Sequence, residues 1–325
     1  MEEKDFWIAF NHVMGIGPTR FQKLLNTFGD ARSAWRAGVK ELSEVIGPGI
    51  AQKVEEERKK IEPEKLREKI EGKNFKILTL QDDDYPPLLR HISNPPFLLY
   101  MWGNLDFRQF DFFISIVGTR RPTPYGRKVT RILASDLAKE NWVVVSGLAL
   151  GIDGEAHSSV VQEEGITVGV LGSGLEVIYP SSHRKLAGEI VEKGGAIISE
   201  YPPPCPPRPE NFPPRNRIIS GLTQGVVVVE APQHSGALIT ADFALEQGRE
   251  VMAIPGSIFS PQSEGTNNLI AQGAKLVQNK GDILETLGFS PGKIRNSGRG
   301  DSHLQGDEKE LFSFIDSSGV FKEEL

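Results

Sequence analysis

Short apolar runs rich in β-branched residues alternate with helix-patterned segments through most of this chain. Their apolarity is continuous rather than alternating, which is typical of strands covered by helices on both faces. Strand–helix repetition joins parallel strands through right-handed crossovers. The pattern therefore predicts an α/β fold with a parallel, doubly wound sheet. The predicted strands are Phe113–Val117, Val143–Val145, Thr167–Leu171, Ala196–Ile198, Val226–Val229, Val251–Ile254 and Lys275–Val277, with Phe75–Leu80 and Phe97–Met101 as two earlier strands that extend the sheet.

The chain has 325 residues, which is enough for about two domains. Residues 1–72 have a helical pattern and equal numbers of basic and acidic side chains, so we expect a small all-α domain there. The α/β domain then spans residues 73–290. Residues 291–306 are rich in Gly, Ser, Asn, Arg and Asp and are predicted to be a linker. Residues 307–325 hold one short amphipathic helix and are too few for another folded domain.

The composition excludes several classes of protein. Lys and Arg total 37 against 43 Asp and Glu, and this net charge of −6 argues against a chain that coats nucleic acid without preference. The single cysteine, Cys205, excludes a disulfide framework and a cysteine-based zinc site, and the six histidines show no metal-ligand spacing. We therefore expect no metal and no cofactor. An acidic N-terminus and the lack of a long apolar run predict a cytoplasmic protein without a membrane contact.

Four glycine-bearing turns directly follow predicted strands. In a doubly wound sheet these turns lie together at the carboxyl edge, where ligands bind. Glycine lets backbone N–H groups approach a phosphate, and the following helix adds the positive end of its dipole. Four turns on one edge therefore favour an anion site over four plain tight turns. They are Gly118-Thr119-Arg120, Ser146-Gly147-Leu148, Gly172-Ser173-Gly174 and Pro255-Gly256.

Nucleotide-enzyme motifs are weak or missing in this sequence. The dinucleotide fingerprint fails because Val177 stands where Gly172-x-Gly174 needs a third glycine, and no P-loop sequence occurs. His157 follows two acidic residues, and we interpret it as a helix-surface histidine rather than as an acid–base group.

Positive charge is concentrated near the predicted turns. No acidic residue lies between Asp111 and Asp136, a stretch that carries five Arg and Lys side chains. Arg184 and Lys185 follow the Gly172–Gly174 turn. If the turns share one sheet edge, these cations converge on an anion several charges long, which fits a nucleic-acid groove better than a single small metabolite.

Eight of the 22 prolines lie in residues 201–214. We interpret this segment as a stiff loop that delivers Arg215, Asn216 and Arg217 to a fixed place. The alternative is a polyproline ligand for another protein.

Two glycine-rich turns lie between predicted helices in the first 72 residues. Gly15-Ile16-Gly17 and, about thirty residues later, Gly47-Pro48-Gly49 are each flanked by apolar residues. The pattern resembles a tandem helix-hairpin-helix (SAM-like) domain, in which such turns offer backbone N–H groups to a DNA phosphate. Gly15, Gly17, Gly47 and Gly49 are therefore candidate secondary DNA contacts. The alternative is a small helical bundle without a DNA contact.

Ordered blocks of sequence run through residues 75–285. They include Ile116-Val117-Gly118-Thr119-Arg120-Arg121, Ser146-Gly147-Leu148-Ala149-x-Gly151-Ile152-Asp153, Gly172-x-Gly174 leading to Tyr179-Pro180, Ser199-Glu200-Tyr201-Pro202, Phe212-Pro213-x-Arg215-Asn216-Arg217, Val229-Glu230-Ala231, Ser235-Gly236-Ala237-Leu238-Ile239-Thr240, Pro255-Gly256 and Gly265-Thr266-Asn267. In this order they resemble the signature of the DNA processing protein A family (DprA, also called Smf).

The resemblance implies an extended Rossmann-like domain that binds single-stranded DNA, works as a homodimer and delivers the strand to a RecA-type recombinase. In naturally competent bacteria, members of the family protect incoming single strands during transformation. The family has no established catalytic activity. The resemblance also implies that residues 307–325 are a truncated remnant of the winged-helix domain with which many members end.

The resemblance assigns DNA contacts to the predicted turns. Arg120 would hold a phosphate, while Lys185 and Arg215–Arg217 would line the same pocket. Phe212 would stack on a base, because every base has a π-face, although a hydrophobic plug under the proline loop is the alternative. The full predicted set is Gly118, Thr119, Arg120, Arg121, Gly147, Gly172, Gly174, Lys185, Phe212, Arg215, Asn216, Arg217, Ser235 and Gly236.

A second function comes from a different class of protein. Related Rossmann-like enzymes hydrolyse the N-glycosidic bond of nucleoside monophosphates with a glycine-rich phosphate turn and one acidic residue. Glu230 or Asp153 are the candidates for that acid. Such an enzyme needs one cation for a single phosphate, whereas this chain offers several.

Overall fold

The computed structural model describes residues 1–289, and Met1–Leu287 form one compact unit. The predictions of a linker at 291–306 and of a short helix in 307–325 lie outside the described residues.

The first 71 residues form six helices, as their pattern predicts. Proline at the first helical position begins three of them, where its missing N–H costs no hydrogen bond. Aromatic side chains of this segment pack against the sheet: Phe21 stacks on Phe97 with ring centroids 4.1 Å apart, and both belong to one hydrophobic core. The helices are α1 (Glu3–Asn11), α2 (Pro18–Phe28), α3 (Ala31–Arg36), α4 (Val39–Ile46), α5 (Pro48–Arg58) and α6 (Pro63–Glu71).

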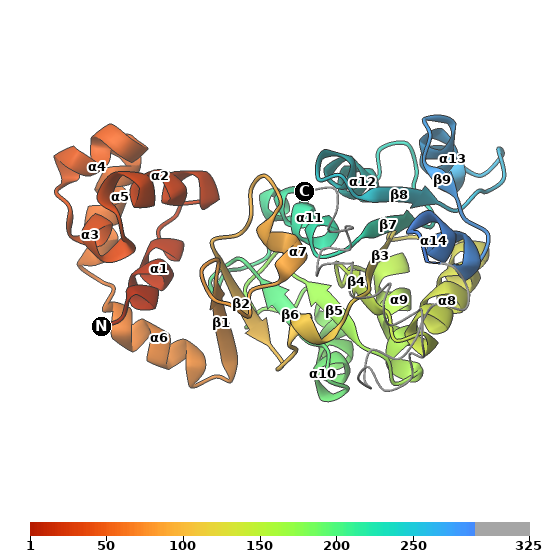
Figure 1. The fold of residues 1–325 in the computed structure, drawn as a ribbon, viewed down its shortest axis with the longest axis horizontal. Coiled ribbons are helices and arrows are strands. Elements are labelled where there is room, and N and C mark those ends of the chain that lie inside the picture. The colour runs from red at the N-terminus through yellow and green to blue at the C-terminus, as the bar shows by residue number, and fades with distance from the viewer. Residues whose placement is uncertain (290–325) are drawn as a thin grey trace, which may run out of the picture. The chain divides into compact units, whose positions relative to one another are not determined.

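The centre of the molecule is a nine-stranded sheet in the order β1-β2-β6-β5-β4-β3-β7-β8-β9 (Figure 1). The seven strands from β6 to β9 in this order pair in parallel, whereas β1 and β2 add an antiparallel edge. This confirms the predicted doubly wound sheet and its extension by two earlier strands. The strands are β1 (Phe75–Thr79), β2 (Leu98–Trp102), β3 (Phe113–Val117), β4 (Val143–Ser146), β5 (Thr167–Val170), β6 (Ala196–Ser199), β7 (Gly225–Val228), β8 (Glu250–Ala253) and β9 (Lys275–Leu276).

Helices cover both faces of this sheet (Figure 1). Strand β3 leads into the helices of one face and β7 into those of the other, although β3 and β7 are neighbours. A doubly wound sheet opens a crevice at such a switch point, just beyond the carboxyl ends of the strands. One face carries α8 (Pro124–Lys139), α9 (Ile152–Gln162), α10 (Arg184–Glu192) and α14 (Lys280–Thr286), and the other carries α7 (Pro87–Arg90), α11 (Phe212–Gly221), α12 (Gly236–Glu246) and α13 (Glu264–Ala271).

Every residue of β3, β4, β5 and β6 is buried, which agrees with their continuous apolar runs. Within residues 1–289, no helix combines the length and the apolarity needed to cross a membrane.

Candidate functional site

A cavity of about 890 Å³ lies at the switch point between β3 and β7. Its walls are the turn after β3, the first turn of α11 and the start of α12. Nine residues of the predicted set line it, although they come from three separate parts of the sequence. They are Gly118, Thr119, Arg120, Arg121, Phe212, Arg215, Asn216, Ser235 and Gly236.

The turn after β3 is fixed by Glu230. The backbone N–H of Thr119 donates to the carbonyl of Glu230 at 2.7 Å. The buried carboxylate of Glu230 accepts hydrogen bonds from the backbone N–H and hydroxyl of Thr123, at 2.8 and 2.6 Å. A Cβ on Gly118 would lie 2.6 Å from Ile152 and 2.9 Å from the Glu230 carbonyl oxygen, so only glycine fits this approach.

Arg120 and Arg121 are exposed at the end of this turn. Neither takes part in any of the ion pairs formed among residues 1–289. Their charge is therefore available to an anion in the cavity.

An aromatic surface lies beside Arg120. Phe212 is half-buried, and its ring centroid is 5.8 Å from the Arg120 guanidinium carbon. The ring rests on Gly172, where a Cβ would lie 2.8 Å from Phe212 Cδ1. Tyr179, which is 44% exposed, lies 5.6 Å from Phe212 between ring centroids and also lines the cavity. Tyr179 was not among the predicted DNA contacts, although it belongs to the sequence block that begins with the Gly172–Gly174 turn five residues earlier.

Arg215 lines the cavity but is buried. Its guanidinium donates to the carbonyl oxygens of Gly147, at 2.9 Å, and Val170, which joins the ends of β4 and β5. The carboxylate of Asp153 accepts the Gly147 N–H at 3.1 Å. Burial lowers the pKa of Arg215 to about 10 and raises the pKa of Asp153, and each group's opposite charge counteracts that shift in its partner. Gly147 itself leaves no room for a side chain, because a Cβ would lie 2.7 Å from Arg215 Nη2.

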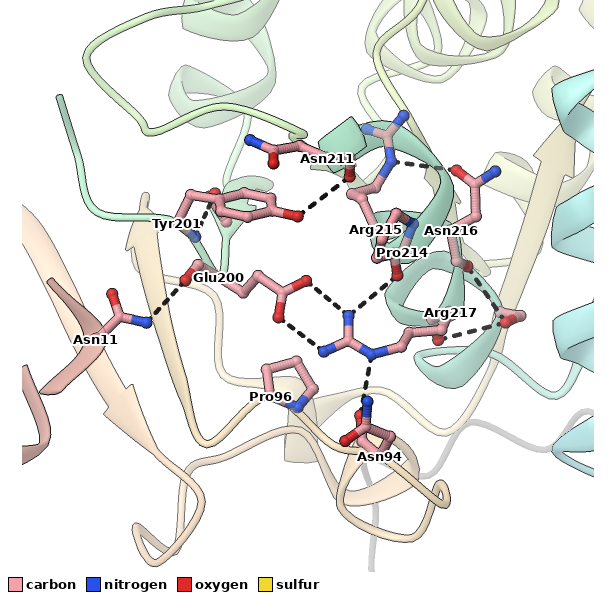
Figure 2. A network of polar contacts seen from close by, with 12 residues as sticks. Asn11, Asn94, Pro96, Glu200, Tyr201, Asn211, Pro214, Arg215, Asn216 and Arg217 are labelled. Atoms are coloured by element: carbon pink, nitrogen blue, oxygen red, sulfur yellow. Dashed lines mark hydrogen bonds and ion pairs between the residues drawn. The ribbon is translucent and has the colours of Figure 1, made fainter. Parts of the chain in front are cut away.

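Arg217 does not line this cavity, which corrects the expectation that Arg215–Arg217 share one pocket. Figure 2 shows its guanidinium facing the Glu200 carboxylate, with two contacts of 2.7 Å. Its Nε donates to the Asn94 carbonyl at 3.0 Å. Residues 212, 215 and 216 face the switch-point cavity, whereas Arg217 lies on another face of the same helix and borders a second cavity. The Glu200–Arg217 ion pair therefore holds α11 in place.

Lys185 and Gly174 are also absent from the cavity wall. The Lys185 side chain is 88% exposed and pairs with Glu189 at 3.3 Å, one turn along α10. Gly174 packs against the proline segment instead, and its N–H donates to the Cys205 carbonyl at 2.8 Å. The proline segment is thus bonded to the body of the protein, as expected for a stiff loop.

The acid-free stretch after Asp111 supplies fewer free cations than its sequence indicates. Arg127 and Arg131 both pair with Glu155, which lies on the neighbouring helix α9. Lys128 is exposed, with no ion pair in the described part of the chain.

The candidate secondary contacts lie elsewhere. Gly15 and Gly17 line the second cavity, of about 870 Å³, together with Arg208 and Arg217. Gly47 lies between α4 and α5, Gly49 lies in the first turn of α5, and neither borders that cavity.

His157 is a core residue, so its interpretation as a surface histidine was wrong. It is fully buried, and its Nδ1 lies 2.7 Å from the hydroxyl of Thr167. That hydroxyl donates to the Val144 carbonyl, so Nδ1 is the donor of the pair. Burial lowers the pKa of His157 to about 3 because it penalises the charged imidazolium.

Acid is expected to destabilise the protein below pH 6.5 through His157. Between pH 6.5 and about 3 the unfolded state binds this proton and the folded state does not, so the free energy of unfolding falls by up to about 1.4 kcal/mol per pH unit. Urea unfolding of the wild type and of His157→Gln at pH 7.5, 6.5 and 5.5 measures this loss. The variant should show the flatter decline, and parallel declines would contradict a neutral, buried imidazole.

The fold and the cavity together define a Rossmann-like α/β protein with a candidate ligand site at its switch point. The comparisons with known proteins agree with this fold. The chain belongs to the family of DNA recombination-mediator protein A, whose model matches residues 76–288.

Similarity extends beyond this domain. Protein Smf of Synechocystis is 40% identical over 323 residues, which cover 98% of this chain and 80% of the relative. The X-ray structure of DNA processing protein A from Streptococcus pneumoniae superposes with a TM-score of 0.75 at 35% identity, over 86% of this chain and 97% of that one. A structure of DNA processing protein A from Helicobacter pylori, described for its single-stranded DNA binding mode, has a TM-score of 0.59 at 31% identity, over 66% and 95% of the two chains.

Proposed function

We propose that this protein binds single-stranded DNA in the switch-point cavity and delivers the strand to a RecA-type recombinase, without catalysing a reaction itself. The observation that carries the proposal is one cavity that combines aromatic surface with two exposed arginines, which form no ion pair within residues 1–289. Arginines contact phosphates, and aromatic rings stack on bases of any sequence. The Helicobacter pylori relative, which is described as binding single-stranded DNA, supports the same function.

The parts of the cavity have separate roles in this proposal. A phosphate lies at the Gly118–Arg120 turn, with Arg120 as its fork-shaped cation. Phe212 and Tyr179 receive a base. Arg215 neutralises Asp153 and supports the wall, because its donors are already directed at backbone carbonyls.

A nucleoside-monophosphate hydrolase is the less favoured function. It needs a free carboxylate near the sugar, and both candidates are engaged: Glu230 is bonded to Thr123, and Asp153 is buried beside Arg215. Neither predicted acid is therefore free, although a third carboxylate, that of Glu264, lines the cavity and is exposed. A hydrolysis assay with nucleoside monophosphates separates the two functions, since the DNA-binding proposal requires no turnover.

Homodimer formation, recombinase delivery and a cytoplasmic location are further parts of the proposal. The short edge strand β9 supports homodimer formation, because Leu276 is exposed and no strand within residues 1–289 pairs with its outer side. Family membership supports delivery of the strand to a recombinase. Light scattering tests the dimer, and recombinase filament assembly on protein-bound strands tests the delivery.

Single strands are expected to bind more tightly than duplexes of equal length, because paired bases cannot reach Phe212 and Tyr179. Affinity should fall with salt, with a log–log slope of about 0.7 for each phosphate neutralised. Gel shifts and fluorescence anisotropy across a salt series measure both effects. Equal affinity for the two forms would contradict the cavity as the main contact and would favour the turns at Gly15–Gly17 and Gly47–Gly49.

A further inference from the structure

The loop that follows β8 exposes two large apolar side chains. Ile258 is 82% exposed and Phe259 is 90% exposed, the highest values among the large apolar residues of the described chain. Two adjacent, highly exposed apolar side chains form a candidate contact surface, because burying them against a partner is favourable.

The loop has a fixed conformation despite this exposure. The Gly256 N–H donates to the Asn267 side-chain oxygen, and the Asn267 amide donates back to the Gly256 carbonyl, both at 3.1 Å. The Ser260 N–H donates to the Ser257 carbonyl at 3.0 Å, which closes the tip. A surface ordered in advance loses little conformational entropy on binding.

The loop lies at the same sheet edge as the candidate DNA cavity. It follows the carboxyl end of β8, two strands from β3. Its stem contacts the first turn of α8, where the Tyr125 hydroxyl donates to the Pro255 carbonyl at 2.8 Å. Gln262, within the loop, and Glu264, directly after it, line the cavity. The C-terminal end of the loop therefore borders the cavity, whereas Ile258 and Phe259 lie outside its lining.

The chemistry of the tip suits a nucleobase. Residues 257–263 carry no charge, and the exposed carboxylate of Glu264 directly follows them. The nearby Arg120 and Arg121 provide the exposed positive charge. Alternating cations and accessible aromatic rings are the arrangement by which proteins hold single strands without reading their sequence.

We propose that Phe259, flanked by Ile258, is a second stacking platform, which receives an unpaired base of the strand after it leaves the switch-point cavity. This inference rests on the proposed function. It adds a site on a different loop and predicts that the strand crosses the cavity rim at the end of β8.

The test compares wild type, Phe259→Ala and Phe259→Trp in fluorescence anisotropy with oligo(dT) strands of increasing length. Phe259→Ala should lose about fivefold to a hundredfold in affinity for long strands and little for the shortest strand that binds. Phe259→Trp should keep the affinity, and the indole fluorescence should be quenched by the strand. Leu245→Ala, which removes another exposed apolar side chain outside the cavity, is the matched control and should bind normally.

Two results would overturn the inference. One is a Phe259→Ala protein that binds strands of every length like the wild type, while Arg120→Ala still binds poorly; the proposed function then stands without the second platform. The other is a loss of affinity in Phe259→Ala that accompanies a change in oligomeric state by light scattering, which would make the tip a contact between copies of the chain. A wild type that binds no single strand would overturn the proposed function itself.

Discussion

Arg120→Ala is expected to weaken the binding of single-stranded DNA by about tenfold or more, with little change in melting temperature. Arg120 lies on a turn whose backbone is fixed by Glu230, so its main chain is held at the cavity wall before the strand arrives. The loss corresponds to one charge-assisted contact to a phosphate, on the order of 1.5–3 kcal/mol. Stability should be retained because Arg120 is exposed and forms no ion pair within residues 1–289.

Anisotropy titrations at several salt concentrations measure this effect. The log–log salt slope of Arg120→Ala should drop by about 0.7, because one phosphate contact is lost. Arg120→Lys should recover only part of the affinity, since an ammonium cannot reproduce the two-pronged guanidinium contact. Lys128→Ala is the matched control, an exposed cation outside the cavity wall. A folded Arg120→Ala protein with wild-type affinity would contradict the proposed site.

Removing either partner of the Glu200–Arg217 ion pair is expected to destabilise the protein by about 3–5 kcal/mol. The two side chains are only 13% and 7% exposed, so each single substitution leaves a buried charge without its partner. The effect should extend to DNA binding, because Arg217 holds the helix that carries Phe212 and Arg215 into the cavity (Figure 2).

Urea unfolding of Glu200→Ala, Arg217→Ala and the double variant tests this prediction. The double variant should lose less stability than the sum of the single variants, because it leaves no unpaired charge. Lys193→Ala is the matched control: it breaks an exposed pair with Glu164 and should cost less than about 1 kcal/mol. Single variants that cost no more than this control would show that the buried pair does not hold α11.

The continuous apolar runs predicted the strands closely, because burial on both faces of a parallel sheet leaves a local signature in each strand. The same runs predicted that the turns at Gly118–Arg120 and Ser146–Leu148 lie at one edge, since the carboxyl ends of parallel strands lie together. The sequence also held signals that local reasoning could not interpret correctly. His157 follows acidic residues on α9, yet its side chain is buried. Helix α9 packs on the sheet, where Thr167 of β5 contacts the imidazole.

The charge pattern shows most clearly which features the sequence determines and which depend on the tertiary structure. The sequence by itself determined that arginines follow β3 and the proline loop, and it predicted that they converge if the turns share one sheet edge. Only the tertiary structure decided which of these cations are free. Arg217 is bound by Glu200, seventeen residues earlier, and Arg127 by Glu155 on another helix, whereas Arg120 and Arg121 form no such pair within residues 1–289. An ion pair depends on the distance between two side chains in space, and that distance is set by how whole elements pack rather than by the sequence around either residue.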